Sequence, residues 1–367
     1  MTTDPIWRDP DWRGPGPGPA PEDAEVCVVG LGGSGLAAVK RLTESNRKVV
    51  GIDAGRIAGG AAGANGGFLL AGTSAFFDEA TEVLGEERAG EIYAMTESAI
   101  GTLVGDRARA GSLRIAGSPR ELESCRNHLE GLRAAGFKAE WYVGSEGEGL
   151  LIPGDTTYQP VHTARRTTER VLEGGARLHE DTRAVRIKPG FVDTDRGPIR
   201  CDHVIVAIDG LLGSVVPELA GRSRSERLQM LATEPVWRTV TTRAVYRRWG
   251  MEYYQQLPDG RITLGGFRDA EGDEAWTTST ETTPEVQDSL DELLQGRLGI
   301  DAPVRHRWAA TVSYTDGILP ICEEISPGLA VTGAYNGTGN VIGRLCGEAL
   351  ADQYLGGRSH WLDLLGG

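Results

Sequence analysis

The chain has 367 residues, which at about 100–200 residues per domain is enough for two or three domains. It is 40% hydrophobic and can bury a large core, so a disordered or fibrous protein is not expected. Its formal charge of −14 repels phosphate backbones, which argues against nucleic acid as a partner.

Neither a membrane segment nor a secretory signal is evident. No apolar stretch reaches the roughly 18–20 residues needed to span a bilayer, and no basic start precedes an apolar run. The cysteines are odd in number and form no Cys-x-x-Cys or His/Cys cluster, which argues against disulfides and a zinc site. They are Cys27, Cys125, Cys201, Cys322 and Cys346. We expect a cytoplasmic protein with no membrane partner and no metal.

The first 24 residues form a leader rich in proline and glycine. Its six prolines prevent a helix or a central strand. Trp7 and Trp12 are the only indication that the leader packs against the rest of the protein, and the sequence leaves open whether it is ordered.

The next residues predict a βαβ unit of a parallel sheet. Val26–Val29 is a short apolar run typical of a buried strand, residues 36–43 have helical spacing, and 48–53 is a second buried strand.

Further elements follow in chain order. The pattern is helical and charged over 75–135, and 182–187 with 190–194 predicts a strand pair. A buried strand follows at 201–208, and alternation over 232–267 predicts an antiparallel sheet with a turn at 258–260. The last elements are an amphipathic helix at 285–298, a buried strand at 328–332, a glycine-rich turn and a helix at about 340–355.

The turn after the first strand matches G-x-G-x-x-G at Gly30, Gly32 and Gly35. Because the chain holds 52 glycines, the match is informative only through its context. It follows a buried strand and opens a helix, and Asp53 ends the next strand. Glycines there permit a sharp turn and a close approach of main chain to a pyrophosphate. The helix N-terminus offers N–H donors to the pyrophosphate, and Asp53 can accept hydrogen bonds from ribose hydroxyls. We conclude that a dinucleotide binds here.

The segment after Asp53 distinguishes FAD from NAD. A nicotinamide domain usually continues into a helix, whereas here small residues persist over 54–67 and include Asn65-Gly66-Gly67. This stretch resembles the D-amino-acid-oxidase-like (DAO) superfamily of FAD oxidoreductases. Residues 307–320 and 332–343 are similar to two further motifs of that superfamily, and 259–261 with Gly265-Gly266 matches a hairpin of its substrate domain.

The resemblance implies an α/β fold, α+β overall. A Rossmann-type FAD-binding domain of the glutathione-reductase-like kind would accompany a substrate domain with a mixed or antiparallel sheet. We expect a leader at 1–24, a discontinuous FAD domain at 25–75, 146–227 and 305–367, and a substrate domain at 76–145 and 228–304.

The resemblance also implies the residues that contact FAD, from the glycine turn to the C-terminal turn that folds over the flavin. They are Gly30, Gly32, Gly33, Ser34, Gly35, Asp53, Ala54, Arg56, Gly60, Ala61, Ala62, Asn65, Gly66, Gly67, Val185, Ala207, Gly210, Gly333, Asn336, Gly337, Thr338, Gly339 and Asn340. Family members with covalent FAD attach it through a cysteine in the tryptophan-containing segment, which corresponds to residues 307–320 here. Ser313 occupies that region and Cys322 lies too far on, so we expect non-covalent FAD.

The family's chemistry implies a small-molecule amine substrate: a hydride leaves the C–H next to the amine nitrogen, giving an imine and, with O2, hydrogen peroxide. Amino-acid oxidases of the family hold the substrate carboxylate with an arginine after the tryptophan segment, and none lies between Arg307 and Arg344. The motifs are most similar to the gamma-glutamylputrescine oxidase branch, with departures at Ala62, Ala64 and Ala309-Ala310. A secondary-metabolite amine or an amino sugar is therefore an open alternative.

The electron acceptor stays open. Sarcosine oxidases of the family activate O2 with a lysine on the hairpin strand, and none of the four lysines here lies near it. A dehydrogenase or tailoring enzyme with another acceptor, and a flavin-binding protein without turnover, are the alternatives. We assign no catalytic residue and no oligomeric state. The candidates for the substrate pocket are Tyr254, Gln256, Trp308, Tyr335 and Asn336.

Overall fold

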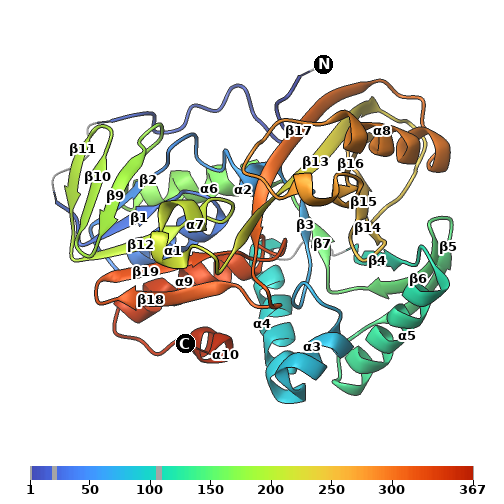
Figure 1. The fold of residues 1–367 in the computed structure, drawn as a ribbon, viewed down its shortest axis with the longest axis horizontal. Coiled ribbons are helices and arrows are strands. Elements are labelled where there is room, and N and C mark those ends of the chain that lie inside the picture. Colours follow the sequence, from blue (N-terminus) through green and yellow to red (C-terminus); the bar gives the residue numbers. More distant parts are fainter. Residues whose placement is uncertain (1, 19–22, 105–109, 367) are drawn as a thin grey trace. The chain divides into compact units, whose positions relative to one another are not determined.

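A computed structural model of the chain describes residues 2–18, 23–104 and 110–366. Parts of the predicted leader (1 and 19–22) and of the predicted helical region (105–109) therefore lie outside the described residues. The chain divides into two compact units (Figure 1). Unit 1 comprises Met1–Ile6, Ala64–Tyr158 and Glu226–Thr311, and unit 2 comprises Trp7–Gly63, Gln159–Ser225 and Val312–Gly367. The assignment of FAD and substrate to particular domain boundaries stays a prediction.

Unit 2 is built on a six-stranded sheet in the order β18-β19-β12-β1-β2-β8. Neighbouring strands are parallel except for the antiparallel pair β18 and β19. Its central strands are continuous apolar runs, as expected of parallel strands that are covered on both faces. The bounds are β1 (Val26–Val29), β2 (Val49–Ile52), β8 (Arg177–His179), β12 (His203–Ala207), β18 (Ile321–Ser326) and β19 (Leu329–Gly333).

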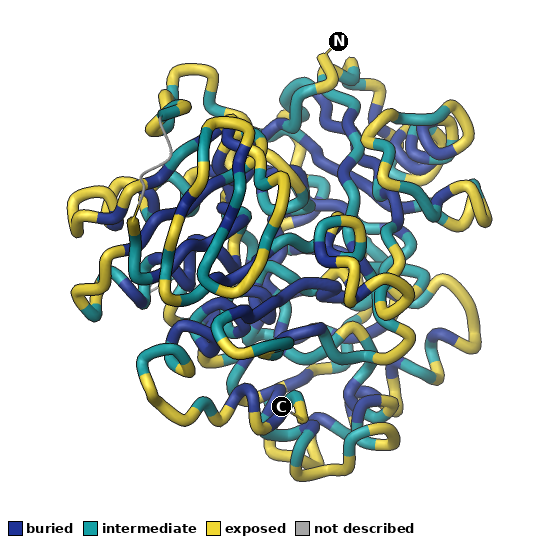
Figure 2. The backbone as a smooth tube through the Cα atoms, turned by 60° about the vertical axis from the view of Figure 1, so that its left-hand side comes forward, coloured by how far each residue is buried: buried dark blue, intermediate teal, exposed yellow. Residues whose placement is uncertain are grey.

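Helices and a second sheet cover this sheet. Helix α1 packs beside α9 and α6, and α9 also contacts β12, β18 and β19. The small antiparallel sheet β11-β10-β9 adds Val192 and Ile199 to the apolar core of the central strands. The bounds are α1 (Gly33–Glu44), α6 (Pro160–Glu173), α9 (Ile342–Tyr354), β9 (Ala184–Lys188), β10 (Phe191–Thr194) and β11 (Gly197–Arg200), with short α7 (Leu212–Val215), η1 (Pro217–Leu219) and α10 (His360–Leu365). Figure 2 shows long interior stretches of buried backbone, whereas most outer turns are exposed.

Unit 1 is built on an eight-stranded sheet in the order β17-β13-β16-β15-β14-β4-β6-β5. Strands β4 and β14 pair in parallel whereas the pairs β15–β16 and β14–β15 are antiparallel, so the sheet is mixed. The bounds are β4 (Ser112–Ile115), β5 (Glu140–Gly144), β6 (Gly147–Ile152), β13 (Arg224–Pro235), β14 (Ala244–Arg247), β15 (Glu252–Gln256), β16 (Arg261–Gly266) and β17 (Val304–Tyr314), beside the two-stranded pair β3 (Phe68–Leu69) and β7 (Thr156–Thr157).

One face of this sheet is apolar and carries a helix. Val286, Leu290 and Leu294 of α8 and η4 pack against side chains of β4, β13, β14, β15 and β16. The helices and helical turns are α3 (Phe77–Leu84), α4 (Glu86–Val104), α5 (Pro119–Ala134), η2 (Arg268–Ala270), η3 (Gly272–Ala275), α8 (Pro284–Glu292) and η4 (Leu293–Arg297). Helix α2 (Ala61–Ala64) begins in unit 2, and only its last residue belongs to unit 1.

Most predicted elements are confirmed, including the βαβ unit, the strand pair, the antiparallel sheet and the turn at 258–260, where Gly260 N–H bonds to Leu257 O. The helix predicted at 285–298 is α8, which ends in a π-helical turn at Leu293–Arg297. The helical pattern over 75–135 is confirmed by α3, α4 and α5, but β4, which was not predicted, interrupts it. Strand β4 is only four residues long and is held by β6 and β14, so no local periodicity reveals it.

From Trp7 onward, the described part of the leader packs within unit 2. Trp7 is 4% exposed, and its carbonyl accepts a hydrogen bond from Gln159 Nε2 at 3.0 Å. Farther on, the Gly16 carbonyl accepts the N–H of Glu180 at 3.2 Å, while Trp12 is only partly buried. Trp7 therefore anchors the leader.

Candidate functional site

The glycine turn joins β1 to α1 through two close approaches of main chain. Gly30 has a φ of +95°, and a Cβ there would lie 2.5 Å from the Ala207 carbonyl oxygen. A Cβ on Gly35 would lie 1.8 Å from the Gly30 carbonyl oxygen. Side chains at either position would push the helix away from the strand ends, so this turn requires glycine.

The N-terminus of α1 has the features of an anion-binding site. Its N-cap Gly32 provides no side-chain cap, and no acidic residue lies in the first turn. The first N–H groups of a helix lack partners within the helix and carry a partial positive charge. A Cβ on Gly33 would meet nothing within 4 Å, so main chain is accessible there. Ser34 is buried, and its Oγ accepts a hydrogen bond from the Tyr335 hydroxyl at 2.8 Å.

Asp53 follows β2 and fixes the turn from the other side. Its Oδ2 accepts the Leu31 N–H at 2.8 Å, and its Oδ1 accepts the Gly55 N–H at 2.9 Å. Burial raises the pKa of Asp53, these two bonds oppose the rise, and the nearby Glu180 adds to it. The remaining lone pairs of the carboxylate suit the hydroxyls of a ribose.

Glu180 was missed by the sequence analysis. It is buried, and its carboxylate accepts the Ile57 N–H at 2.8 Å, so it orders the segment that follows Asp53. A carboxylate after a three-residue strand gives no motif by which it could have been found.

The small-residue segment carries the next predicted contacts. In unit 2, Ala54, Arg56 and Gly60 are exposed, and a Cβ on Gly32 would be 3.4 Å from the Ala62 Cβ. Ala61 therefore lies next to a residue packed against the glycine turn. In unit 1, Asn65 Oδ1 accepts the N–H of Gly67 at 2.8 Å in a tight turn around Gly66.

The third group of predicted contacts surrounds the end of β12. Ala207 lies against Gly30, and a Cβ on Gly333 would be 2.6 Å from the Ile208 carbonyl oxygen. The Gly210 carbonyl accepts the Ser225 hydroxyl at 2.7 Å. Val185, in contrast, lies on β9 and is largely exposed.

The turn after β19 is held by many hydrogen bonds. Asn336 Oδ1 accepts the Thr315 N–H at 2.8 Å, and the Thr338 hydroxyl donates to the Tyr335 carbonyl at 2.6 Å. Gly337, Gly339 and Asn340 lead from this turn to α9, whose first residue is Ile342, two residues later than predicted.

Together these features fit FAD. The uncapped start of α1 offers donors to a pyrophosphate, Asp53 offers acceptors to a ribose, and Gly30, Ala207 and Gly333 bring the ends of three parallel strands together. Ligands of such sheets bind at the carboxyl ends of the strands. That each predicted residue contacts FAD stays a prediction.

The five pocket candidates all have structural partners. Tyr254 lies in the apolar core beneath α8, where burial raises the pKa of its hydroxyl to about 12. Gln256 braces a loop by donating to Val236 O and Arg238 O, both at 2.9 Å.

The other three candidates also have hydrogen-bond partners within the protein. The Trp308 indole donates to Ala64 O at 2.7 Å, Tyr335 bonds to Ser34, and Asn336 bonds to Thr315. Their contact with substrate stays a prediction, but the hydrogen bonds that they form are those of core residues.

The opposite face of the unit 1 sheet has the more suitable side chains. One cross-strand row runs through Arg114, Tyr246, Tyr253, Gly265 and Met230. The rings of Tyr246 and Tyr253 are stacked with centroids 5.7 Å apart, and Arg114 lies 5.0 Å from the Tyr246 centroid.

Two further residues extend this row, which with them we call the aromatic face. The Phe68 ring packs against Tyr246 and Tyr253 with centroid distances of 5.4 and 6.1 Å. Gln255, beside Tyr253 on the same strand, donates to Gly66 O. A Cβ on Gly265 would be 2.7 Å from the Tyr253 ring, so this glycine makes room for it. The sequence analysis chose Tyr254 and Gln256, on the other face of β15, as pocket candidates, and that choice stays a prediction.

Arg114 is neutralised by a buried carboxylate. Asp155 accepts from Arg114 at 3.3 Å, from the Ser112 hydroxyl at 2.5 Å and from the Ala71 N–H at 2.8 Å. Burial raises the pKa of Asp155, and Arg114 opposes the rise. The hydroxyl of Tyr93 is buried and has no hydrogen-bond partner among the residues that the structure describes.

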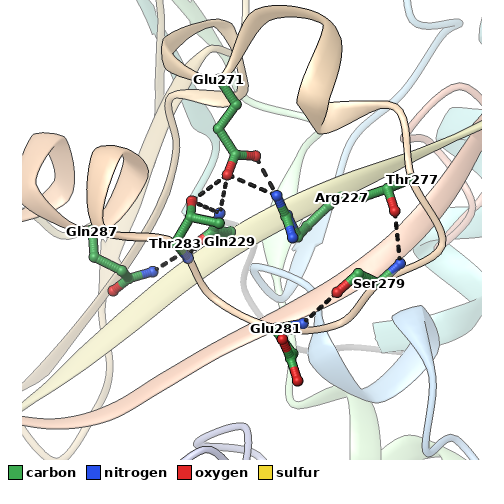
Figure 3. A network of polar contacts seen from close by, with 8 residues as sticks. All are labelled: Arg227, Gln229, Glu271, Thr277, Ser279, Glu281, Thr283 and Gln287. Atoms are coloured by element: carbon green, nitrogen blue, oxygen red, sulfur yellow. Dashed lines mark hydrogen bonds and ion pairs between the residues drawn. The ribbon is translucent and has the colours of Figure 1, made fainter.

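A second polar network in unit 1 is centred on Glu271 (Figure 3). Its carboxylate accepts from Arg227 at 2.9 Å, from Gln229 at 3.1 Å and from the Thr283 hydroxyl. Both ends of the segment between β16 and α8 are thereby fixed to β13.

Neither a metal cluster nor a membrane helix is found in the described part of the chain. Within residues 2–18, 23–104 and 110–366, no group of three or more His, Cys, Asp or Glu side chains is placed to hold a metal ion. Over the same residues, no helix combines the length and apolarity that crossing a membrane requires.

Comparison with known proteins gives consistent matches. The family model described as DAO, FAD dependent oxidoreductase, matches residues 25–353. The "Probable oxidoreductase OrdL" of Rhizobium meliloti (strain 1021) is 27% identical over 95% of this chain and 86% of the relative. The gamma-glutamylputrescine oxidoreductase of Escherichia coli (strain K12) is 24% identical over 89% of this chain and 83% of the relative. The crystal structure of glycine oxidase from Geobacillus kaustophilus superposes with a TM-score of 0.74 and 17% identity, covering 93% of this chain and 96% of that one.

Proposed function

The chain belongs to the DAO family of FAD-dependent oxidoreductases, and on that premise we propose that it is an amine oxidase acting on an amine without an adjacent carboxylate. When bound, FAD supplies the acceptor for a hydride from the C–H next to the amine nitrogen, which leaves an imine and, with O2 as final acceptor, hydrogen peroxide. The single observation that carries the proposal is the aromatic face of unit 1 beside the Asn65–Gly67 turn.

The aromatic face suits the amine in both of its protonation states. Aromatic rings such as those of Tyr246, Tyr253 and Phe68 attract an ammonium ion by about 0.5–2 kcal/mol. An apolar surrounding also lowers the pKa of a bound amine, which favours the neutral form with its free lone pair. The neutral amine is the form from which a hydride can leave, so these side chains both bind the substrate and promote loss of its proton.

The two arginines that lie nearest in the sequence to the expected carboxylate-binding position support an amine substrate over an amino acid. Arg307 Nη1 donates to Gln287 at 2.7 Å, and its Nη2 pairs with Asp291 at 2.8 Å. Arg344 pairs with Glu348 at 2.9 Å. Arg114 of the aromatic face is likewise paired, with Asp155 at 3.3 Å. A substrate carboxylate would have to compete with a carboxylate already bound to one of these three arginines, which disfavours glycine and D-amino acids. Polyamines and their conjugates, amino sugars and N-alkyl amines keep the reacting group without this requirement.

FAD is proposed to be non-covalent. Ser313 lies at the place where covalent members carry cysteine, and its Oγ is 3.4 Å from the Ser225 hydroxyl. Cys322 is buried with its thiol directed to the Cys346 carbonyl at 3.7 Å. Acid precipitation should therefore leave all of the FAD in the supernatant, and a yellow pellet would contradict this.

A dehydrogenase is the second candidate, because no lysine lies on the β15–β16 hairpin that would carry the O2-activating lysine. Lys40 instead pairs with Glu44 on α1, and Lys138 is exposed. Oxygen consumption and peroxide release should be measured with each amine of a panel, in parallel with reduction of an artificial dye. Peroxide in amounts equal to the amine consumed supports the oxidase. Dye reduction without oxygen consumption would establish the dehydrogenase instead.

A further inference from the structure

A carboxylate that no motif indicated lies between the end of β12 and the turn after β19 in unit 2. Asp209 follows β12, and its Oδ1 accepts the Tyr335 N–H at 3.1 Å. The main-chain N–H groups of Ser313 and Ala334 lower the pKa of this carboxylate, as the Tyr335 N–H does. The hydrogen bond to Tyr335 thus joins the end of β12 to the turn after β19.

That turn has a conformation that needs external support. Ala334 and Asn336 have φ values of +53° and +54°, in the left-handed region that side chains with a Cβ disfavour. Such backbone persists only where the surroundings fix it. Asn336 is fixed by its own side chain through Thr315, whereas the N–H group of Tyr335 depends on Asp209.

We propose that Asp209 is a positioning residue for FAD: it holds the Ala334–Thr338 turn in its strained conformation by accepting the main-chain N–H of Tyr335. The link to FAD rests on the proposed contact between this turn and the flavin. Alanine at 209 would leave the N–H group of Tyr335 without its acceptor, and the turn would open.

The protonation of Asp209 provides a signature that a merely structural brace lacks. Burial raises the pKa of Asp209 to about 6, although the three N–H groups oppose the rise. The titratable neighbour on the packed turn is the Tyr335 phenol, whose pKa burial raises well above its ordinary value, so it stays protonated. Opening the turn to water would return Asp209 toward its ordinary pKa of 3.8. The closed turn therefore binds a proton more tightly than the open turn, and lowering the pH from 8 to 5 favours closure.

Hydrogen exchange of the protein without FAD tests the role directly. We expect the amides of residues 334 and 335 to exchange at least tenfold faster, after correction for intrinsic rates, in Asp209→Ala than in the wild type at pH 7.5. In the wild type their protection should rise as the pH falls through about 6. In Asp209→Asn this pH dependence should vanish, because the amide does not titrate.

The matched control is Asp202→Asn, which removes a carboxylate from an exposed position just before the same strand. It should behave as the wild type, and protection of β1 should stay unchanged in every variant. Unchanged protection at 334 and 335 in Asp209→Ala, or a wild-type pH series without a rise, would overturn the proposal.

A titration with FAD separates this inference from the proposed cofactor contact. We expect Asp209→Ala to raise the FAD dissociation constant at least tenfold at pH 7.5, measured by flavin fluorescence, while Asp202→Asn leaves it unchanged. Loss of protection with an unchanged dissociation constant would show that Asp209 holds the turn but that the turn does not contact FAD.

Discussion

At the scale of single residues, neighbouring side chains of β15 point to opposite faces of the sheet and therefore have different roles. Tyr254 is 4% exposed and packs beneath α8, whereas Tyr253 stacks on Tyr246 and lies over Gly265. The sequence shows that the two tyrosines face opposite ways, but not which face is covered by a helix. That information lies in α8, some 30 residues further along the chain.

The pair provides a matched test of the aromatic face. Tyr253→Leu should slow anaerobic reduction of the flavin by an amine substrate about tenfold, because one cation–π partner worth roughly 0.5–2 kcal/mol is lost. Tyr254→Leu should change this rate less than twofold while lowering the thermal unfolding midpoint. Stopped-flow absorbance gives both rates. Slow flavin reduction in Tyr254→Leu, together with an unchanged rate in Tyr253→Leu, would instead place the substrate on the face of β15 that carries Tyr254 and Gln256.

At the scale of helices, strands and loops, buried polar side chains fix loops to the sheets. Glu271 ties the segment between β16 and α8 to β13, as Figure 3 shows, and its partner Arg227 is buried with it. Removing one partner of a buried ion pair is costly because the other charge stays behind without compensation.

Glu271→Gln should therefore lower the free energy of unfolding by about 3 kcal/mol. The exposed Glu281, which lies in the same segment, is the control, and Glu281→Gln should remain within about 0.5 kcal/mol of the wild type. Urea denaturation followed by circular dichroism measures both values. Equal effects of the two variants would show that the buried pair does not contribute to stability.

The leader is the second element whose role the structure specifies. Trp7→Ala should lower the free energy of unfolding by about 3–5 kcal/mol, as expected for a buried tryptophan. Trp12→Ala should cost clearly less, because Trp12 is only partly buried. Should both variants match the wild type in urea denaturation, the leader would contribute nothing to the stability of unit 2.

Elements with strong local signals were predictable, and elements defined by distant partners were not. The βαβ unit combines an apolar run, a glycine turn and a helical period within 30 residues, so each local preference agrees with the fold. Strand β4 is four residues long and pairs in parallel with β14, more than 100 residues away. The same limit applies to the site: Asp53 follows a motif, whereas Asp209 and Glu180 gain their roles only from main chain that arrives from elsewhere.

At the scale of the whole molecule, the two units divide the chemistry. Unit 2 brings together the glycine turn, Asp53, the end of β12 and the turn after β19, which are the features that fit FAD. Unit 1 carries the aromatic face that we propose for the amine. The family membership establishes an FAD-dependent oxidoreductase, and the proposal adds the class of substrate.

The central claim is that amines without an adjacent carboxylate reduce the bound flavin. The most direct measurement is anaerobic mixing of the FAD-loaded protein with a panel of polyamines, N-alkyl amines, amino sugars and amino acids, followed at the visible absorption band of the flavin. We predict that at least one carboxylate-free amine bleaches this band and that admission of air restores it. Bleaching by glycine or D-amino acids alone, or by no amine at all, would contradict the account, and the latter result would favour a flavin-binding protein without turnover.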